Sequence, residues 1–287
     1  MARLFERVTI AGVGLIGGSL GLAARAAGLV GEIVGLGRGA ANLELARARG
    51  IVDRYSHDPA EAARDADLLV LAVPVARMAA VAQACAPVLR HGAIVTDVGS
   101  VKESVVREVE AVLPPHLAFV GAHPIAGTEE SGAAAAFADV FRGARCVLTP
   151  SRRSTADAVA RVRALWEGVG MRVEALDPSY HDQVLAWVSH LPHALAFSLV
   201  NGLLDVDPAM QRFGGPSFRD ATRVASSSVD TWTEIFLCNA QLDAVLGAFA
   251  RTLEALRAAV ARRDAAAVRA ALARAQGARR DWSGSGA

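Results

Sequence analysis

Short runs of apolar residues alternate along the first half of the chain with longer, alanine-rich stretches of mixed polarity. The short runs are apolar throughout rather than at every second position, which is typical of strands covered by helices on both faces. The longer stretches carry apolar residues at helical spacing. We expect strands at residues 8–11, 33–36, 68–73, 94–97, 118–120 and 146–149, and helices at 15–27, 76–89 and 102–113.

The pattern changes near residue 177. A helix at 156–169 and a strand at 172–175 complete the first half, and Asp177-Pro178-Ser179 then breaks the alternation. Beyond this break, residues 182–204 and 231–276 follow a helical pattern with almost no strand signal. We therefore expect an α/β fold followed by an all-α region, with a doubly wound parallel sheet in domain 1–176 and helices alone in domain 177–287.

The leading helix of the second domain, at residues 182–204, is apolar around much of its circumference. A helical domain of this size would have difficulty burying so wide an apolar face by itself. We expect helices from two copies of the chain to pack together, which predicts a homodimer.

The composition narrows the choice of partner. The chain has 287 residues, 30 basic and 29 acidic side chains and a net charge of +1, so it has no single-sign field that attracts nucleic acid or a membrane surface. Its three cysteines form no CxxC pair, which argues against disulfides and zinc. Glycines interrupt an apolar stretch at 8–24 that otherwise outlines a secretory signal, and no run reaches the roughly 18 apolar residues of a membrane span. We expect a cytoplasmic protein with a small-molecule partner.

A glycine-rich loop follows the first expected strand. Gly12, Gly14 and Gly17 have the GxGxxG spacing of a dinucleotide-binding loop and lie between a strand and a helix. In such a loop the first glycine permits the turn, the second lets the pyrophosphate approach the backbone, and the third brings the helix against the strand. The backbone amides at the start of the helix, at Leu15 and Ile16, can receive the phosphates. This arrangement predicts a dinucleotide cofactor.

The end of the second expected strand bears on the choice between NADP and NAD. An acidic residue usually stands there and binds the ribose hydroxyls, whereas this chain has Gly37 followed by Arg38. A guanidinium beside a glycine suits a 2′-phosphate, so the sequence favours NADP. Arg38 could instead stack on the adenine or face solvent, which leaves NAD open.

Two further strand ends fall at the carboxyl edge of the expected sheet, where ligands of this fold bind. Val73 and Pro74 end one strand, and Ser100 follows the next. We expect these residues to flank the nicotinamide. Ser100 begins a predicted helix, so a plain N-cap is its alternative role.

His123 lies one nucleotide-binding domain's length downstream of the glycine loop, within the Gly-Ala-His-Pro-Ile-Ala-Gly-Thr-Glu segment of residues 121–129. Its ordinary pKa near neutrality lets it accept a proton at physiological pH. We expect glycine and Pro124 to hold it on a stiff turn. A histidine satisfied by local hydrogen bonds at a strand end is the alternative, and the cofactor loop upstream favours a catalytic role.

The helical half holds two more polar groups. His190 and His193 lie three residues apart in an apolar helix, with Pro192 perturbing its hydrogen bonds. No cysteine or carboxylate cluster completes a metal set around them, which argues against a metal. Arg223 follows Asp220 by three residues, so it either binds a substrate carboxylate or pairs with Asp220 on a solvated helix face.

Five short segments closely resemble, in the same order, motifs of the prephenate and arogenate dehydrogenase family of tyrosine biosynthesis. The resemblance implies a Rossmann domain followed by a helical dimerisation domain, and a hydride transfer to NADP or NAD coupled to decarboxylation. The segments are residues 12–18, 96–102, 121–132, 189–193 and 218–223.

The resemblance also implies roles for single residues. His123 matches the catalytic histidine that accepts a hydrogen bond from the ring hydroxyl of the substrate, with Ser100 alongside it. Arg223 matches the arginine that binds the ring carboxylate. Further substrate-binding and supporting positions match Glu129, Thr128, His190, His193 and Asp220.

The motifs leave two matters open. They do not decide between prephenate, whose side chain ends in a keto acid, and arogenate, in which an ammonium group replaces the ketone. Another two-domain hydroxyacid or imine reductase, or an NADP-binding sensor without catalysis, would share the cofactor loop and the helical half. Turnover of prephenate or arogenate separates the expected enzyme from both alternatives.

Overall fold

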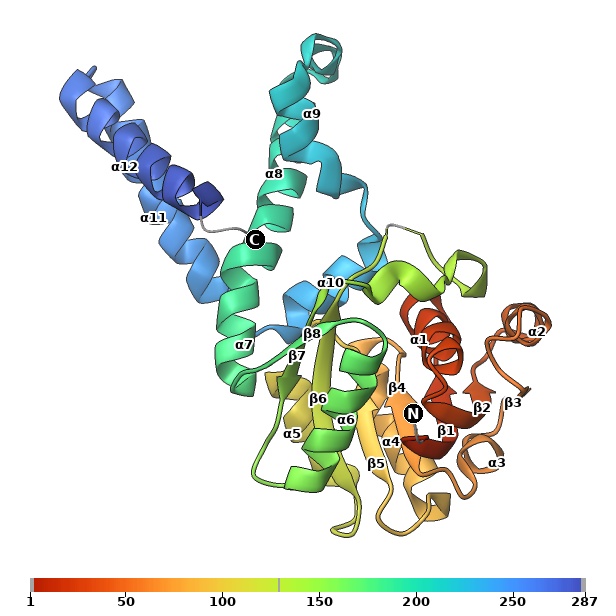
Figure 1. The fold of residues 1–287 in the computed structure, drawn as a ribbon. Coiled ribbons are helices and arrows are strands. Elements are labelled where there is room, and N and C mark those ends of the chain that lie inside the picture. The colour runs from red at the N-terminus through yellow and green to blue at the C-terminus, as the bar shows by residue number, and fades with distance from the viewer. Residues whose placement is uncertain (1–2, 129, 285–287) are drawn as a thin grey trace. The chain divides into compact units, whose positions relative to one another are not determined.

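The computed structural model describes residues 3–128 and 130–284. The chain forms two compact units, Met1–Ala240 and Gln241–Ala287 (Figure 1). The first unit contains the whole sheet and the helices as far as residue 238. The expected fold class, an α/β region followed by helices, is confirmed. The domain division at residue 177 stays a prediction.

An eight-stranded sheet forms the centre of the first unit. Its strands are β1 (Phe5–Ala11), β2 (Val30–Leu36), β3 (Arg54–Ser56), β4 (Leu68–Leu71), β5 (Ile94–Asp97), β6 (Ala118–Ile125), β7 (Arg145–Thr149) and β8 (Arg172–Ala175). They lie in the order β3-β2-β1-β4-β5-β6-β7-β8, and all neighbours are parallel except β6 and β7. The chain builds outward from β1 to β3 and then continues at β4 on the other side, which is the switch of a Rossmann sheet.

The expected strands are wrong in three respects that bear on the site. The strand expected at 68–73 ends at Leu71, so Val73 and Pro74 lie in the loop after β4. The short strand β3 is absent from the expectation, and β6 continues past Val120 to Ile125 and pairs antiparallel with β7. His123 therefore lies in a strand and not on a turn. The strand β5 pairs with β6 only as far as Val120, so at Pro124 the strand β6 pairs with β7 alone. A proline is tolerated at such an edge position because its missing N–H removes no hydrogen bond to a second strand.

Ten α-helices belong to the first unit as the structure describes it. They are α1 (Leu15–Ala26), α2 (Ala40–Ala48), α3 (Pro59–Ala63), α4 (Met78–Cys85), α5 (Glu103–Val112), α6 (Ala156–Gly168), α7 (Pro178–Leu185), α8 (Leu191–Val206), α9 (Pro216–Thr222) and α10 (Val229–Cys238). Helix α5 begins at Glu103 with Lys102 as its N-cap residue, so the alternative role of Ser100 as N-cap is wrong.

The single helix expected at 182–204 is interrupted. Ala186–His190 form a π-helical turn between α7 and α8. Pro192 follows this turn and has no N–H to donate to the carbonyl group of Val188, four residues earlier. Such turns are often found at functional sites, and this one holds His190 while His193 follows in the first turn of α8.

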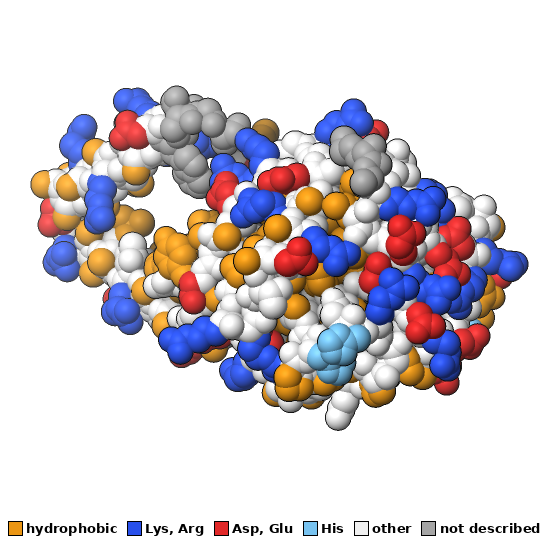
Figure 2. All heavy atoms as spheres, turned by 60° about the horizontal axis from the view of Figure 1, so that its bottom comes forward, with side chains coloured by type: hydrophobic (Ala, Val, Ile, Leu, Met, Phe, Trp, Pro, Cys, Tyr) orange, Lys and Arg blue, Asp and Glu red, His pale blue; other side chains and the backbone are white. Residues whose placement is uncertain are grey.

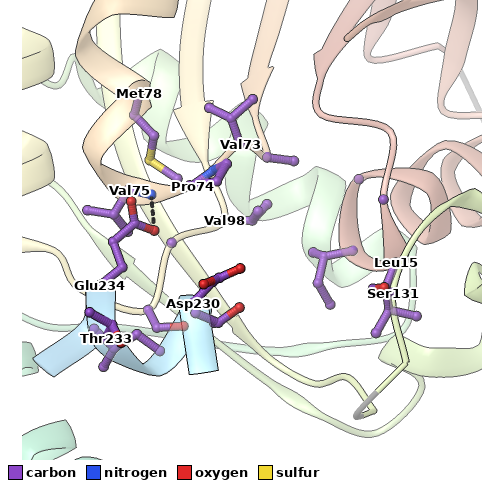
Figure 3. A pocket seen from close by; sticks show the side chains of 18 of the residues that line it. Leu15, Val73, Pro74, Val75, Met78, Val98, Ser131, Asp230, Thr233 and Glu234 are labelled. Atoms are coloured by element: carbon purple, nitrogen blue, oxygen red, sulfur yellow. Dashed lines mark hydrogen bonds between the residues drawn. The ribbon is translucent and has the colours of Figure 1, made fainter. Parts of the chain in front are cut away.

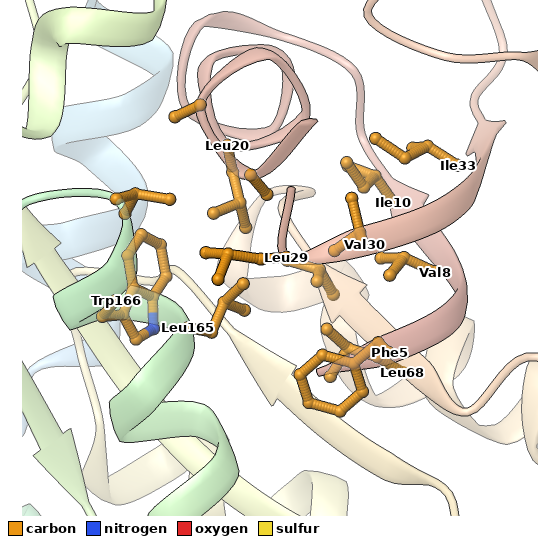
Figure 4. Packing of buried hydrophobic residues seen from close by; sticks show 14 of the residues in the cluster. Phe5, Val8, Ile10, Leu20, Leu29, Val30, Ile33, Leu68, Leu165 and Trp166 are labelled. Atoms are coloured by element: carbon orange, nitrogen blue, oxygen red, sulfur yellow. The ribbon is translucent and has the colours of Figure 1, made fainter. Parts of the chain in front are cut away.

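The core lies on both faces of the sheet. Helices α1, α2 and α6 cover one face, where Leu20, Leu165 and Trp166 belong to the same apolar cluster as Val8 and neighbouring strand residues (Figure 4). Helices α3, α4 and α5 cover the other face. Successive strand residues face opposite layers, so both layers require apolar side chains, and the continuous apolar runs of the sequence follow from this.

The second unit is a pair of helices, α11 (Leu242–Ala261) and α12 (Ala265–Gly284). Apolar side chains are exposed on both, among them Leu253, Val260 and Leu272. In the first unit, the helical stretch Pro178–Val206 is long and apolar enough to cross a membrane by length and composition, with 33% of its most apolar window buried. That differs from our expectation of no stretch long and apolar enough for a membrane span. Core helices of soluble proteins can have the same length and composition.

Acidic and basic side chains are intermingled over the face of the molecule seen in Figure 2. This mixture agrees with the net charge of +1. No group of three or more histidine, cysteine, aspartate or glutamate residues within 3–128 and 130–284 is arranged to hold a metal ion.

Candidate active site

The carboxyl ends of four parallel strands are level in the sheet. Ala11 pairs with Leu36 on one side and with Leu71 on the other, and Leu71 pairs with Asp97. The loops after β1, β2, β4 and β5 therefore leave the sheet along one edge, at the switch between β1 and β4. Ligands of this fold bind at that edge.

The three glycines of the first loop meet different surroundings. Gly12 has a φ of +96°, and a Cβ atom there would lie 2.3 Å from the carbonyl oxygen of Ala72. A Cβ atom on Gly17 would lie 2.2 Å from the carbonyl oxygen of Gly12, whereas Gly14 has nothing within 4 Å. Gly12 and Gly17 thus permit the turn and the helix packing, and the open space at Gly14 fits a pyrophosphate drawn close to the backbone.

A first cavity of about 660 Å³ opens beside this loop. It has the size of a small-molecule site. Helix α10 contributes Asp230 and Glu234 to its wall, and Ser131 comes from the segment after β6 (Figure 3). The loops after β1, β4 and β5 contribute further residues. Of the residues expected to bind the cofactor, those that line it are Gly14, Leu15, Ile16, Gly17, Val73, Pro74 and Ser100.

Glu234 ties α10 to the loop after β4. Its two carboxylate oxygens accept hydrogen bonds from the backbone N–H groups of Val75 and Ala76, each at 3.0 Å (Figure 3). These are the first residues of the short 3₁₀ turn Val75–Arg77, and N–H groups at the start of such a turn have no acceptor within the turn, so the carboxylate of Glu234 satisfies both. The carboxylate therefore fixes one wall of the first cavity.

Arg38 does not line the first cavity. It is exposed beyond the end of β2. The residue before it, Gly37, accepts a hydrogen bond through its carbonyl oxygen from Nδ1 of His57, at 2.8 Å. A second basic side chain thus lies beside the glycine that precedes Arg38, through a contact between the residues that directly follow β2 and β3. This contact was not predicted from the sequence.

A second cavity of about 630 Å³ shares Ser100 with the first. It brings together Thr128, His193 and Arg223, which come from the loop after β6, from α8 and from the turn after α9. Trp232 of α10 completes this wall. Glu129, expected to bind substrate, lies outside the described residues.

His123 is buried, with 7% of its surface exposed. It is not among the lining residues of either cavity, although the nearby Ala126 and Gly127 line the second. Its Nδ1 atom lies 2.9 Å from Nε2 of His181, on α7. Burial, followed by the positive charge that His181, Lys102 and His190 would carry, holds the pKa of His123 well below its ordinary value. His123 is therefore a neutral imidazole at physiological pH.

Lys102 is fully buried and links two strands to the loop of Ser100. Its ammonium group donates to the carboxylate of Asp97 and, at 3.1 Å, to the carbonyl oxygen of Ala122. The same carboxylate accepts from the backbone N–H groups of Gly99 and Ala122. The Lys102–Asp97 pair thus fixes Ala122, which precedes His123, relative to Gly99, which precedes Ser100.

The remaining expected residues lie in different surroundings. His190 is buried, and Nδ2 of Asn239 donates to its Nδ1 at 2.9 Å. It lines neither cavity, and burial lowers its pKa to about 4. Asp220 is exposed on α9 and lines neither cavity. Among the described residues, Arg223 and Asp220 form no ion pair within 4 Å, so nothing there supports the intrahelical alternative.

Several residues of the site were not predicted from the sequence. His181 and Asp182 carry no motif, and only the fold brings them to His123. Lys102 had a signal, because it is the only lysine in a chain with 30 basic residues. The residues of the site that were not predicted are His181, Asp182, Lys102, Trp232 and Glu234.

Comparison with known proteins covers both halves of the chain. A family model described as prephenate dehydrogenase, nucleotide-binding domain, matches residues 20–175. A second, described as prephenate dehydrogenase, dimerization domain, matches residues 177–274. The chain is 38% identical to a cyclohexadienyl dehydrogenase of Zymomonas mobilis, over 91% of this chain and 90% of that protein.

Solved structures agree in fold over almost the whole length. A prephenate dehydrogenase of A. aeolicus, in complex with hydroxyphenyl propionate and NAD+, matches with a TM-score of 0.90 and 33% identity, over 96% of this chain and 98% of that one. A Synechocystis arogenate dehydrogenase matches with a TM-score of 0.83 and 27% identity, over 96% and 99%. The chain belongs to the prephenate dehydrogenase family and is a nicotinamide-dependent oxidoreductase of tyrosine biosynthesis that acts by oxidative decarboxylation.

Proposed function

We propose that this enzyme takes prephenate, arogenate or both, and that the reacting ring lies where the two cavities meet. One observation carries the proposal: Ser100 lines the cavity of the glycine loop and also the cavity that holds Thr128, His193 and Arg223. Hydride transfer requires donor and acceptor in contact. A serine common to both cavities therefore marks the expected meeting point of cofactor and substrate.

The reaction divides between the cofactor and His123. The nicotinamide, when bound, supplies the hydride acceptor. His123, held neutral by burial, takes the proton of the ring hydroxyl as the carbinol carbon becomes a carbonyl carbon. Loss of CO2 then makes the ring aromatic, and His123 returns the proton to the phenol oxygen. Ser100 holds the hydroxyl group beside His123.

Arg223 contributes binding and orientation. Its guanidinium group lies in the second cavity and suits the ring carboxylate of the substrate. That carboxylate leaves as neutral CO2, so a charge pair with it is stronger in the ground state than in the transition state. We therefore assign Arg223 to substrate affinity and not to the rate of decarboxylation.

His193 bears on the choice of substrate. Its Nδ1 faces the carbonyl oxygen of Ser189 at 2.9 Å, so Nδ1 carries the proton. Burial, followed by the charge of Arg223, lowers the pKa of His193 despite the Ser189 contact. Its Nε2 is then an unprotonated acceptor in the second cavity, which suits the ammonium group of arogenate and finds no donor in the keto group of prephenate. This supports arogenate as a substrate beside prephenate.

The preference for NADP rests on the surroundings of Gly37. The position after β2 has no carboxylate, and Arg38 and His57 are both basic and exposed next to it. Two such side chains suit a 2′-phosphate better than a ribose hydroxyl. NADP is the cofactor that we propose, and binding of NAD would follow from the same glycine loop.

Exposed apolar side chains support a homodimer. Helix α8 exposes Leu199, Leu204 and Val206, and the second unit exposes Leu253 and Leu272. Two helices alone have no interior in which to bury such residues. The family description of residues 177–274 as a dimerization domain supports a second copy of this chain as the partner that covers them. A cytoplasmic location stays a prediction.

The test is the near-ultraviolet absorbance of reduced nicotinamide, with NADP and NAD each crossed against prephenate and arogenate. We expect turnover that His123→Asn abolishes, a faster rate with NADP, and a loss of that advantage in Arg38→Ala. Arg152→Ala, another exposed arginine, is the control. Cofactor binding without turnover of either substrate would overturn the proposal, and an unchanged NADP advantage in Arg38→Ala would remove the 2′-phosphate role.

A further inference from the structure

Three buried side chains, those of His123, His181 and Asp182, form a continuous hydrogen-bonded row. Nδ1 of His123 faces Nε2 of His181 at 2.9 Å, and Nδ1 of His181 faces Oδ1 of Asp182 at 2.8 Å. His181 and Asp182 are at most 1% exposed and line neither cavity. The row therefore reaches the catalytic histidine from the side away from solvent.

The row determines where each proton lies. A carboxylate has only acceptors, so Nδ1 of His181 must carry the proton that faces Asp182. A neutral His181 then has an unprotonated Nε2, which can only accept. Nδ1 of His123 must donate to it, and the lone pair of His123 is left on Nε2. Only this tautomer satisfies both contacts with neutral rings.

Two backbone N–H groups also donate to the carboxylate of Asp182. Its Oδ1 accepts from the backbone N–H of Lys102 at 2.8 Å, and its Oδ2 accepts from that of Glu103 at 2.9 Å. These N–H groups open helix α5, whose N-terminal end favours negative charge. The carboxylate thus faces both His181 and the loop that carries Ser100.

We propose that His181 and Asp182 are positioning residues for the reaction: they fix His123 in the tautomer whose Nε2 is the base, and Asp182 stabilises the charge that the two rings acquire. This inference rests on the proposed function of His123. When the hydroxyl proton arrives at Nε2, His123 becomes an imidazolium. Its Nδ1 proton then faces His181, and the positive charge shared by the rings faces the Asp182 carboxylate. The proton returns from Nε2 to the phenol oxygen of the product.

The other titratable groups near His123 and His181 determine how strongly a positive charge on these rings depends on the Asp182 carboxylate. Lys102 carries a positive charge that disfavours a second one on either ring, and His190 adds to this at His123. Asp97, which Lys102 contacts, acts in the opposite direction at His181. The thiol of Cys146, across from Pro124 in β7, stays protonated because burial raises its pKa. Asp182 is the carboxylate in direct contact with His181, and His181 lies between it and His123.

The kinetic test uses His181→Leu, His181→Gln and Asp182→Asn. Leucine removes both contacts, whereas glutamine can present an oxygen to His123 where Nε2 stood. We expect kcat to fall by about 10² to 10⁴-fold in His181→Leu and Asp182→Asn. The kcat of His181→Gln should be about tenfold higher than that of His181→Leu. KM should change little in all three variants, because neither His181 nor Asp182 lines a cavity. Asp177→Asn, which keeps an N-cap on the same helix, is the matched control.

The tautomer can be measured without substrate. In the free enzyme labelled with ¹⁵N-histidine, we expect the nitrogen shifts of His123 to report a protonated Nδ1 and an unprotonated Nε2. His181→Leu should redistribute the proton between the two nitrogens, with His123→Asn identifying the signals. Unchanged cofactor affinity verifies folding of each variant.

The outcomes separate this inference from the proposed function. A wild-type enzyme that turns over neither substrate would contradict the function, whereas the nitrogen shifts would still test the row. Full kcat in Asp182→Asn, equal loss in the leucine and glutamine variants, or a protonated Nε2 on His123 would each overturn the inference.

Discussion

His193 stacks on Trp232, with ring centroids 3.5 Å apart and an angle of 19° between the planes. The contact joins α8 to α10 at the wall of the second cavity. It holds the imidazole in one plane while the bond to Ser189 selects its tautomer. The Nε2 atom of His193 is therefore oriented before a ligand arrives.

Removing the stack should weaken substrate binding. Aromatic pairs contribute roughly 0.5–1.5 kcal/mol beyond their buried area, so we expect Trp232→Leu to raise KM for the ring substrate about threefold to tenfold and to lower kcat less. Trp232→Phe keeps an aromatic face, so its KM should lie between that of the wild type and that of Trp232→Leu. Steady-state kinetics at saturating cofactor measures this, and an unchanged KM in Trp232→Leu would refute it.

Arg223→Ala should raise KM more than it lowers kcat. Hydrogen bonds to charged groups are worth about 1.5–3 kcal/mol, which corresponds to roughly a 10- to 150-fold rise in KM. Arg219→Ala is the matched control, since Arg219 is exposed, comes four residues earlier and does not line the cavity. A variant of Arg223 that loses mainly kcat at constant KM would contradict its assignment to binding.

Glu234→Gln should loosen the first cavity. Glutamine has one acceptor for the two N–H groups of Val75 and Ala76, and its amide N–H₂ group would face the other. Loss of a helix cap costs about 1 kcal/mol, so we expect a several-fold weaker cofactor Kd, measured by fluorescence titration. The exposed Glu167→Gln serves as control; equal affinity in the two variants would show that the wall does not depend on Glu234.

Lys102→Met should destabilise the protein strongly. It keeps the apolar stem but leaves the buried Asp97 carboxylate without its cation, and such losses cost about 3–5 kcal/mol. Urea unfolding measures the change. Adding Asp97→Asn to Lys102→Met should restore part of the loss, because the neutral amide needs no counter-charge. A double variant no more stable than the single one would argue against the charge pair as the cause.

Acid should destabilise the fold through the buried histidines. Burial lowers the pKa of His190 to about 4, so this ring stays neutral in the folded state while the unfolded chain takes up a proton below pH 6.5. The unfolded state then binds more protons, and the free energy of unfolding falls between pH 6.5 and about 4, by on the order of 3 kcal/mol for His190. Above pH 6.5 this contribution is absent.

Urea unfolding at about pH 7 and about pH 5 checks this difference. His190→Gln should lose less stability than the wild type over that interval, since glutamine does not titrate. His116→Gln, which replaces an exposed histidine, should follow the wild type. Equal pH dependence in all three proteins would mean that His190 does not contribute.

The sheet was predictable because most strands are buried on both faces and read as unbroken apolar runs. The strand β3 was not, since Arg54, Tyr55 and Ser56 show no such run and are ordered by pairing with β2. The end of β6 was misread for a similar reason: glycine and proline suggest a turn by local preference, but pairing with β7 holds His123 and Pro124 extended. At β3 and at the end of β6, pairing with a neighbouring strand outweighs the local conformational preference of the residues.

The cofactor loop was predictable because the geometry of a tight turn dictates its glycines. The row behind His123 was not, because His181 lies 58 residues away and reaches it through the packing of α7 on the sheet. Motifs record contacts that are close in sequence, whereas this contact depends on the three-dimensional placement of a helix.

Lys102 is the only lysine of the chain, and none of its side chain is exposed. All other side chains among the 30 lysines and arginines are arginines, whose guanidinium groups stay protonated and are poor nucleophiles near neutral pH. Acylating agents, aldehydes, reducing sugars and cyanate therefore meet no lysine amine on the folded protein. Such reagents would gain access to Lys102 only when the core opens, so the internal ion pair also protects the enzyme from the covalent damage that accumulates on surface lysines.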